Sequence, residues 1–189
     1  MIIPIPLINE IRSYVVPVVP FYSQFTDIHS LSWKSVGCGV TSLAMIINYY
    51  KNENVSVDTL LKEGLRISAY DSRHGWIHKG LIELSENYGL EGESHDLSKF
   101  SKELAFVQLK KHLEEGPVMA SVHYKFDPRS TIPHLVVING MKDNVIYYSD
   151  PATKTGQKQI SLADFQKAWK KKFIVIRPVE KVAAAEELV

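Results

Sequence analysis

Three residues of this chain have types that could together carry nucleophilic chemistry: Cys38, His134 and Asp150. Cys38 is the only cysteine, and residues 43–50 after it form an apolar run long enough for a buried helix. The sequence therefore predicts Cys38 in the first turn of a helix, where the helix dipole and free backbone N–H groups favour the nucleophilic thiolate. A free cysteine more often simply packs in a core, so the nucleophile interpretation requires a base and an orienting group nearby.

The base and the orienting carboxylate are predicted on neighbouring strands. Residues 134–139 and 145–150 have strand patterns, and the five turn-rich residues 140–144 between them predict an antiparallel hairpin. If that connector is symmetric, His134 at the start of one strand faces Asp150 at the end of the other. A carboxylate beside an imidazole fixes the ring tautomer and stabilises the imidazolium, as in a catalytic triad.

Each of these residues has a structural explanation when it is taken alone. A histidine at a strand start is usually structural, and an Asp-Pro pair such as Asp150-Pro151 commonly forms a turn. The combination is more specific, because a cysteine at a helix N-terminus and a His–Asp pair on adjacent strands is the arrangement of thiol proteases. Together they favour a thiol hydrolase over a packing cysteine.

The elements that must position these residues predict an α+β fold, with N-terminal helices packed on a mostly antiparallel sheet that carries His134 and Asp150. Periodicity and capping signals predict helices mainly in the first half, at residues 38–50, 57–63, 76–88, 98–115 and, later, 161–169. Alternating and β-branched runs predict strands at residues 90–95, 118–124, 134–139, 145–150 and 173–177. Residues 14–20 suit an edge strand or extended arm, and residues 25–36 and 68–75 suit loops.

The length of 189 residues fits one domain, which we assign to residues 14–179. We expect residues 1–13 to form an N-terminal arm and residues 180–189 a frayed or disordered tail. A domain of this size buries enough surface to need neither disulfides nor a structural metal, and we predict no cofactor.

The charge balance excludes several classes of partner. Lys plus Arg number 22 against 21 for Asp plus Glu, which gives no basic surface for nucleic acid. No apolar run approaches the roughly 20 residues of a membrane span. The N-terminus lacks the basic n-region of a signal peptide, which is expected of a cytoplasmic protein or of an exported one whose N-terminus has been trimmed.

Several sequence blocks carry a resemblance to a known family: VVPFYSQ at 18–24, GCGVTSLAM at 37–45, GPV at 116–118, HLVVING at 134–140 and YSDP at 148–151. The chain resembles papain-like cysteine peptidases of the bacteriocin-processing, double-glycine-leader peptidase-like family. The resemblance implies a papain-like fold, a peptide or protein substrate, Cys38 as nucleophile, His134 as general base, Asp150 as orienting residue and Gln24 as oxyanion donor. The amide of Gln24 and the backbone N–H of Cys38 would suit a two-donor oxyanion hole.

Two positions differ from the family pattern. The gap between Gln24 and Cys38 is longer than in true leader peptidases, and Val40 stands where many relatives have proline. Because no transporter domain follows, the resemblance is to the stand-alone branch. The same machinery would also serve a transpeptidase or an amidase acting on cell-wall peptide. A peptide-binding module that has lost turnover is the alternative from another class.

Other residues near the predicted cleft are candidate substrate contacts: Trp33, Gly37, Asp71, Trp76, and also His74 and Tyr124. Gly37 and Gly39 flank Cys38, where we expect backbone conformations that a side chain would forbid. His74 and His78 are four residues apart and would share a helix face, but no third ligand accompanies them, so we predict no metal site. We expect the remaining histidines to be exposed or structural: His29, His95, His112 and His123.

Overall fold

A computed structural model describes residues 15–179, so the predicted arm at 1–13 and tail at 180–189 lie outside the described residues. The helices are α1 (Leu31–Lys34), α2 (Cys38–Lys51), α3 (Val57–Arg66), α4 (His78–Glu86), α5 (Lys102–Glu115) and α6 (Leu162–Ala168), with a 3₁₀ turn at Tyr124–Phe126. The strands are β1 (Tyr70–Asp71), β2 (Gly75–Trp76), β3 (Leu90–Asp96), β4 (Val118–His123), β5 (Pro133–Lys142), β6 (Val145–Ser149), β7 (Lys158–Ser161) and β8 (Trp169–Pro178).

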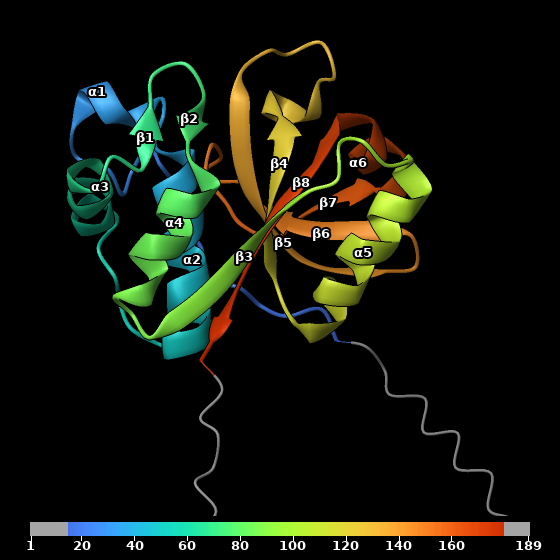
Figure 1. Cartoon of the computed structure of the whole chain (residues 1–189), viewed down its shortest axis with the longest axis horizontal. Helices are drawn as coiled ribbons and strands as arrows, with labels where there is room; N and C mark the ends of the chain where they lie inside the picture. The colour runs from blue at the N-terminus through green and yellow to red at the C-terminus, as the bar shows by residue number, and fades with distance from the viewer. Residues whose placement is uncertain (1–14, 180–189) are drawn as a thin grey trace, which may run out of the picture.

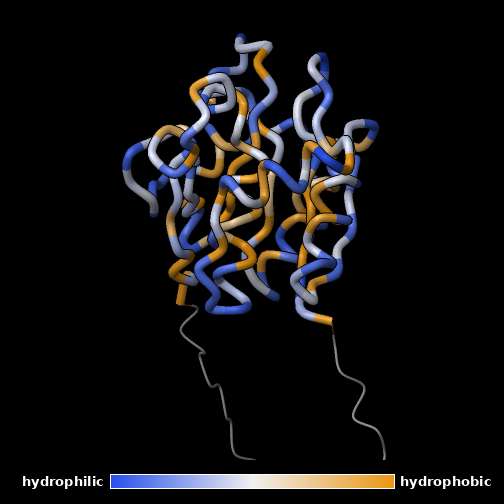
Figure 2. Tube along the Cα trace, turned by 90° about the vertical axis from the view of Figure 1, so that its left-hand side faces the viewer, coloured by the Kyte–Doolittle hydropathy of each residue, from blue (hydrophilic) through white to orange (hydrophobic). Residues whose placement is uncertain are grey.

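A six-stranded antiparallel sheet in the order β3-β8-β4-β5-β6-β7 divides the described residues into two cores. One core joins α2, α3 and α4 to one set of alternating sheet residues, and the other joins α5 and α6 to the alternate set. Figure 1 shows α1 to α4 gathered to one side of the sheet and α5 and α6 to the other. In Figure 2 hydrophobic residues follow the central segments and hydrophilic residues collect at the loop tips. The predicted α+β class and papain-like arrangement are confirmed.

Helix α2 lies against the sheet because its sequence is apolar nearly all round. Its first ten residues, from Cys38 to Ile47, are all buried. Within this run the polar side chains are satisfied locally: the Thr41 hydroxyl donates to the Gly37 carbonyl at 2.8 Å, and the Ser42 hydroxyl donates to the Leu135 carbonyl of β5 at 3.3 Å. The helix ends at Asn52, whose left-handed conformation terminates the ladder. The nucleophile candidate therefore sits on a rigid, buried element.

The β5–β6 hairpin differs from the predicted one. Its strands continue to Lys142 and Val145, so the connector is only the pair Asp143–Asn144, both at positive φ (50° and 60°), as a type I′ turn requires. The sequence pattern missed the extra pairs because Gly140 and Asn144 favour a turn, so the whole stretch 140–144 was predicted as the connector. A bulge where the register shifts between Ile138 and Gly140 then offsets the strands again. The predicted pairing register was wrong.

Helix and strand boundaries differ from prediction at several other places. Trp76 belongs to β2 and helix α4 begins only at His78, so the predicted helix 76–88 is shorter. The predicted loop 25–36 contains the single-turn α1, and the described part of the predicted strand 14–20 is irregular. Helix α3 continues through Gly64 to Arg66, and β8 is longer than predicted while β7 was not foreseen. None of the helices described is long and apolar enough to cross a membrane.

Candidate active site

Cys38 is the first residue of α2 and is 8% exposed. The glycines beside it serve a purpose other than the one predicted, because Gly37 has an ordinary φ of −79° and Gly39 is helical. A Cβ on Gly39 would lie 2.3 Å from the Trp76 ring, and one on Gly37 would lie 2.1 Å from Cδ1 of Ile28. Gly39 is required because the Trp76 side chain packs directly on the backbone beside the thiol, whereas at Gly37 the close atom is the end of the flexible Ile28 side chain.

His134 and Asp150 meet despite the shifted register. Nε2 of His134 lies 2.7 Å from Oδ1 of Asp150, and the two residues are 4% and 5% exposed. Asp150 follows the last residue of β6, and its Oδ1 also accepts the Ala152 N–H at 2.8 Å, which holds the carboxylate in the turn. The Tyr124 ring stands edge-on to the imidazole at 5.2 Å. The hydrogen bond to Asp150 and the edge-on contact with Tyr124 therefore hold the His134 ring in place.

The electrostatics of His134 follow from its two polar neighbours. Burial favours the neutral ring, but hydrogen bonding to Asp150 and to Cys38 outweighs it and raises the pKa of His134 to about 9. Because Nε2 faces the carboxylate, Nδ1 is the nitrogen left to interact with the thiol. A thiol, an imidazole and a carboxylate in this order can generate a thiolate–imidazolium pair and carry out nucleophilic acyl transfer.

Gln24 is also brought to this region, and it is 2% exposed. Its Nε2 donates to the Lys34 carbonyl at 2.7 Å, and its backbone N–H donates to the Pro151 carbonyl at 2.8 Å, next to Asp150. Its Oε1 is buried without a hydrogen-bond partner among residues 15–179. One Nε2 hydrogen is used by Lys34, which leaves the second for another acceptor.

The predicted substrate contacts have packing or turn-forming partners in the structure. Trp33, Tyr70 and Trp76 form an edge-to-face aromatic series at 5.0 and 5.4 Å, and the Trp76 indole donates to the Val36 carbonyl at 2.7 Å. Asp71 accepts from the backbone N–H groups of residues 73 and 74, each at 2.8 Å, and so folds the turn between β1 and β2. Trp76 is buried and packs directly against Gly39, so it stabilises the first turn of α2.

His74 and His78 do not share a helix face, because His74 lies in the β1–β2 turn and only His78 is in α4. His74 contacts Asp71, whereas His78 bonds the hydroxyls of Ser94 and Ser121 at 2.8 and 3.0 Å. A different group comes together instead: Glu93, His95 and His112. Glu93 and His95 are two apart on β3, a spacing that places them on one face, but His112 comes from α5 and no local pattern links it to them.

Solved structures of similar fold are all distant in sequence. A double glycine motif protease from an AMS/PCAT transporter, in complex with the leader peptide, is 24% identical with a TM-score of 0.59, and the match covers 86% of this chain and 93% of the protease. A protein from Bacillus anthracis described as a C39-like peptidase is 21% identical with a TM-score of 0.62, over 86% and 96%. The peptidase domain of Streptococcus ComA is 19% identical with a TM-score of 0.55, over 77% and 93%.

These likenesses establish the fold, which is that of C39 peptidase domains. No match was found among curated proteins. The family model described as the Peptidase_C39 like family matches residues 17–172, which is most of the chain. The chain therefore belongs to the Peptidase_C39 like family.

Proposed function

We propose that the protein is a cysteine peptidase that hydrolyses a peptide bond with Cys38 as nucleophile, His134 as general base and acid, and Asp150 as the residue that orients His134. The observation that carries the proposal is the buried contact between Nε2 of His134 and Oδ1 of Asp150 at 2.7 Å, at a ring whose pKa is also raised by the nearby Cys38 thiol. Three independent segments of the chain converge to make this arrangement, and a packing cysteine would not require it.

The reaction follows from the groups present. The Cys38 thiolate attacks the scissile carbonyl carbon, a C–S bond forms and the carbonyl electron pair moves to the oxygen. Collapse of this intermediate expels the amine, which takes a proton from the His134 imidazolium. His134 then removes a proton from water as it attacks the thioester, and the thiolate leaves. Throughout, Asp150 accepts from Nε2–H and keeps Nδ1 directed at the reacting groups.

Gln24 is proposed as a donor to the oxyanion. The Lys34 carbonyl fixes Nε2 through one of its hydrogens, and the other is free to donate to a developing negative charge. The backbone N–H of Cys38, in the first turn of α2, is the second donor proposed. A fixed donor of this kind acts without reorganisation during the reaction, which is the source of its effect.

The substrate class proposed is a peptide or a peptide segment of a protein. The similar transporter protease was solved with a leader peptide bound, which shows that this fold accommodates a peptide chain. The chemistry would also allow acyl transfer to an amine in place of water. Product analysis by mass spectrometry distinguishes the two, because transfer joins the acyl fragment to the added amine and hydrolysis leaves a free carboxylate.

The test is labelling of Cys38 by a thiol-directed electrophile between pH 5 and pH 8. Wild-type protein should react roughly 100-fold faster than His134→Ala at pH 5.5, because a free thiol has little thiolate there. His29→Ala removes an exposed histidine paired with Asp58 and is the matched control, which should react like wild type. Equal rates for wild type and His134→Ala across this range would contradict the thiolate–imidazolium pair and favour a binding module without turnover.

A further inference from the structure

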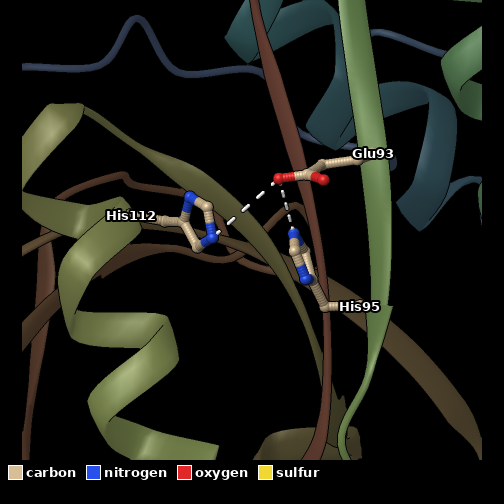
Figure 3. Close-up of side chains that lie close together, drawn as sticks. All are labelled: Glu93, His95 and His112. Atoms are coloured by element: carbon tan, nitrogen blue, oxygen red, sulfur yellow. Dashed lines mark ion pairs between the residues drawn. The ribbon is translucent and has the colours of Figure 1, made fainter.

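A second group of titratable side chains lies outside the proposed catalytic residues. Oε1 of Glu93 is 3.0 Å from Nε2 of His95 and 3.9 Å from Nε2 of His112 (Figure 3). One ligand atom from each residue lies within 4.8 Å of the other two. We refer to Glu93, His95 and His112 as the histidine cluster.

The cluster joins the edge strand of the sheet to a helix. Glu93 and His95 come from β3, which pairs only with β8 in the described sheet, and His112 comes from the last turn of α5. The His95 ring stacks on Phe173 of β8 at 4.4 Å, and the two imidazole rings lie 4.8 Å apart. Apolar packing therefore holds both rings in place with their nitrogens near the Glu93 carboxylate.

The polar atoms of the cluster are not satisfied by one another. Nε2 of His95 and Nδ1 of His112 are buried, and neither has a hydrogen-bond partner among residues 15–179. The Glu93 oxygen is close to Nε2 of His95 but lies outside hydrogen-bond geometry, and it is farther from His112. Elsewhere His78, His123 and His134 each bond a hydroxyl, carbonyl or carboxylate with good geometry. The unpartnered Nε2 of His95 calls for a bound group at the cluster, whereas the unpartnered Nδ1 of His112 lies on the side of Glu115, 3.8 Å from its Oε2.

The geometry points to a binding site for a divalent transition-metal ion of the Zn²⁺ class, with Glu93, His95 and His112 as protein ligands. Two imidazoles and one carboxylate are ligands that Zn²⁺ takes, and bond lengths near 2.0 Å place tetrahedral ligand atoms about 3.3 Å apart. The separations of the Glu93 oxygen from the two histidine nitrogens, 3.0 and 3.9 Å, bracket that spacing, and all three ligand atoms lie within 4.8 Å of one another, so binding would draw the two imidazoles inward. Glu115, with Oε2 3.8 Å from Nδ1 of His112, is placed to orient this ligand from outside.

The proposed metal site would stabilise the fold and would take no part in the reaction at Cys38. Its ligands belong to β3 and α5, whereas the proposed catalytic residues belong to α2, β5 and the turn after β6. A bound ion would fasten the edge strand β3 to α5 and satisfy the buried His95 nitrogen at the same time. It would also cover part of an edge strand, which proteins otherwise protect with charge or bulges.

The first test is calorimetric titration of the full chain with ZnCl₂, in the Cys38→Ser variant so that the thiol cannot compete as a ligand. We expect one Zn²⁺ per chain and a rise of roughly 5 °C in melting temperature at 100 times the dissociation constant, reversed by EDTA. Absence of binding in Cys38→Ser would overturn the proposal, because this variant keeps all three residues of the histidine cluster.

Substitutions in the same background locate the ion. His112→Ala and Glu93→Gln should each bind Zn²⁺ at least 10-fold more weakly, while His29→Ala, which removes a histidine elsewhere, should bind as the parent does. Glu93 has a side chain 61% exposed, so Glu93→Gln is expected to fold even if His112→Ala does not. Unchanged affinity in Glu93→Gln, with unchanged metal-induced stabilisation, would overturn the assignment.

Discussion

The proposed catalytic residues and the histidine cluster both place imidazoles beside carboxylates, yet they differ in burial and in hydrogen bonding. His134 and Asp150 are almost fully buried and share a 2.7 Å bond, whereas Glu93 has a side chain 61% exposed and lies 3.9 Å from His112. Burial lowers the pKa of a histidine in both places. It is outweighed at His134 by the bonds to Asp150 and Cys38, and it prevails at His112, whose pKa is lowered.

The comparison shows that a carboxylate near a histidine does not by itself make a charged pair. At His134 a short, buried hydrogen bond to the Asp150 carboxylate stabilises the imidazolium. The Ala152 N–H also donates to that carboxylate and so holds it in position. At His112 burial outweighs the exposed Glu93 carboxylate 3.9 Å away and lowers the pKa, and a metal ion displaces the proton of such a histidine more readily. The two sites are therefore suited to proton transfer and to ligation respectively.

The largest effect is expected when the His134–Asp150 pair is broken in place. Asp150→Asn keeps the side-chain shape but removes the charge, and it allows the amide to hold the wrong tautomer of His134. We expect a loss of about 10³- to 10⁴-fold in kcat on a peptide substrate. Asp143→Asn in the β5–β6 turn is the matched control, since asparagine suits the positive φ of 50° there. An Asp150→Asn enzyme within 10-fold of wild type would show that the carboxylate does not orient the base.

Removal of Gln24, the proposed oxyanion donor, is expected to have the next largest effect. Gln24→Ala should lower kcat by roughly 100- to 1,000-fold with little change in KM, because the donor acts mainly in the transition state. Gln108→Ala on the exposed face of α5 serves as control. Since Gln24 is buried and bonded to Lys34, the melting temperature is measured alongside. A rise in KM at constant kcat would instead assign Gln24 to substrate binding.

The sequence predicted the elements around the site better than it predicted how they pair. The apolar run after Cys38 predicted α2 correctly, because an apolar segment of that length is typical of a helix buried on all faces. The hairpin register was wrong because the Asp143–Asn144 turn and the bulge at residue 139 depend on backbone conformations that composition does not determine. His134 and Asp150 still meet because Asp150 lies beyond the strand, in a turn where the Ala152 N–H holds its carboxylate.

Two contacts between segments far apart in the sequence were not predicted from local patterns. The need for glycine at position 39 arises from Trp76, and His112 joins Glu93 only through the packing of α5 on the sheet. Trp76 was predicted as the start of a helix, but it ends the short strand β2 and packs on α2. A periodic pattern identifies which face of an element is apolar but does not identify its partner.

Gly39→Ala tests whether close packing, rather than backbone freedom, requires glycine at position 39. A methyl group there would meet the Trp76 ring at 2.3 to 2.7 Å, so we expect a loss of about 1 to 3 kcal/mol in the free energy of unfolding. Urea denaturation measures it. In a Trp76→Ala background, which removes Cγ and Cδ1 of this side chain, the same substitution should cost less. An equal cost in both backgrounds would contradict the packing explanation.

A pH dependence of stability is expected to separate His134 from the histidine cluster. The pKa of His134 is raised from 6.5 to about 9 in the folded state, so the proton stabilises the fold fully below pH 6.5, and this contribution is lost as the pH rises towards 9. The difference in unfolding free energy between wild type and His134→Gln should therefore shrink across that range in urea titrations under reducing conditions. His123→Gln, outside the pair, should retain the wild-type slope. A difference that stays constant from pH 6.5 to 9 would mean that the imidazolium is not held by Asp150 and Cys38, and the contrast between the two sites would then rest on burial alone.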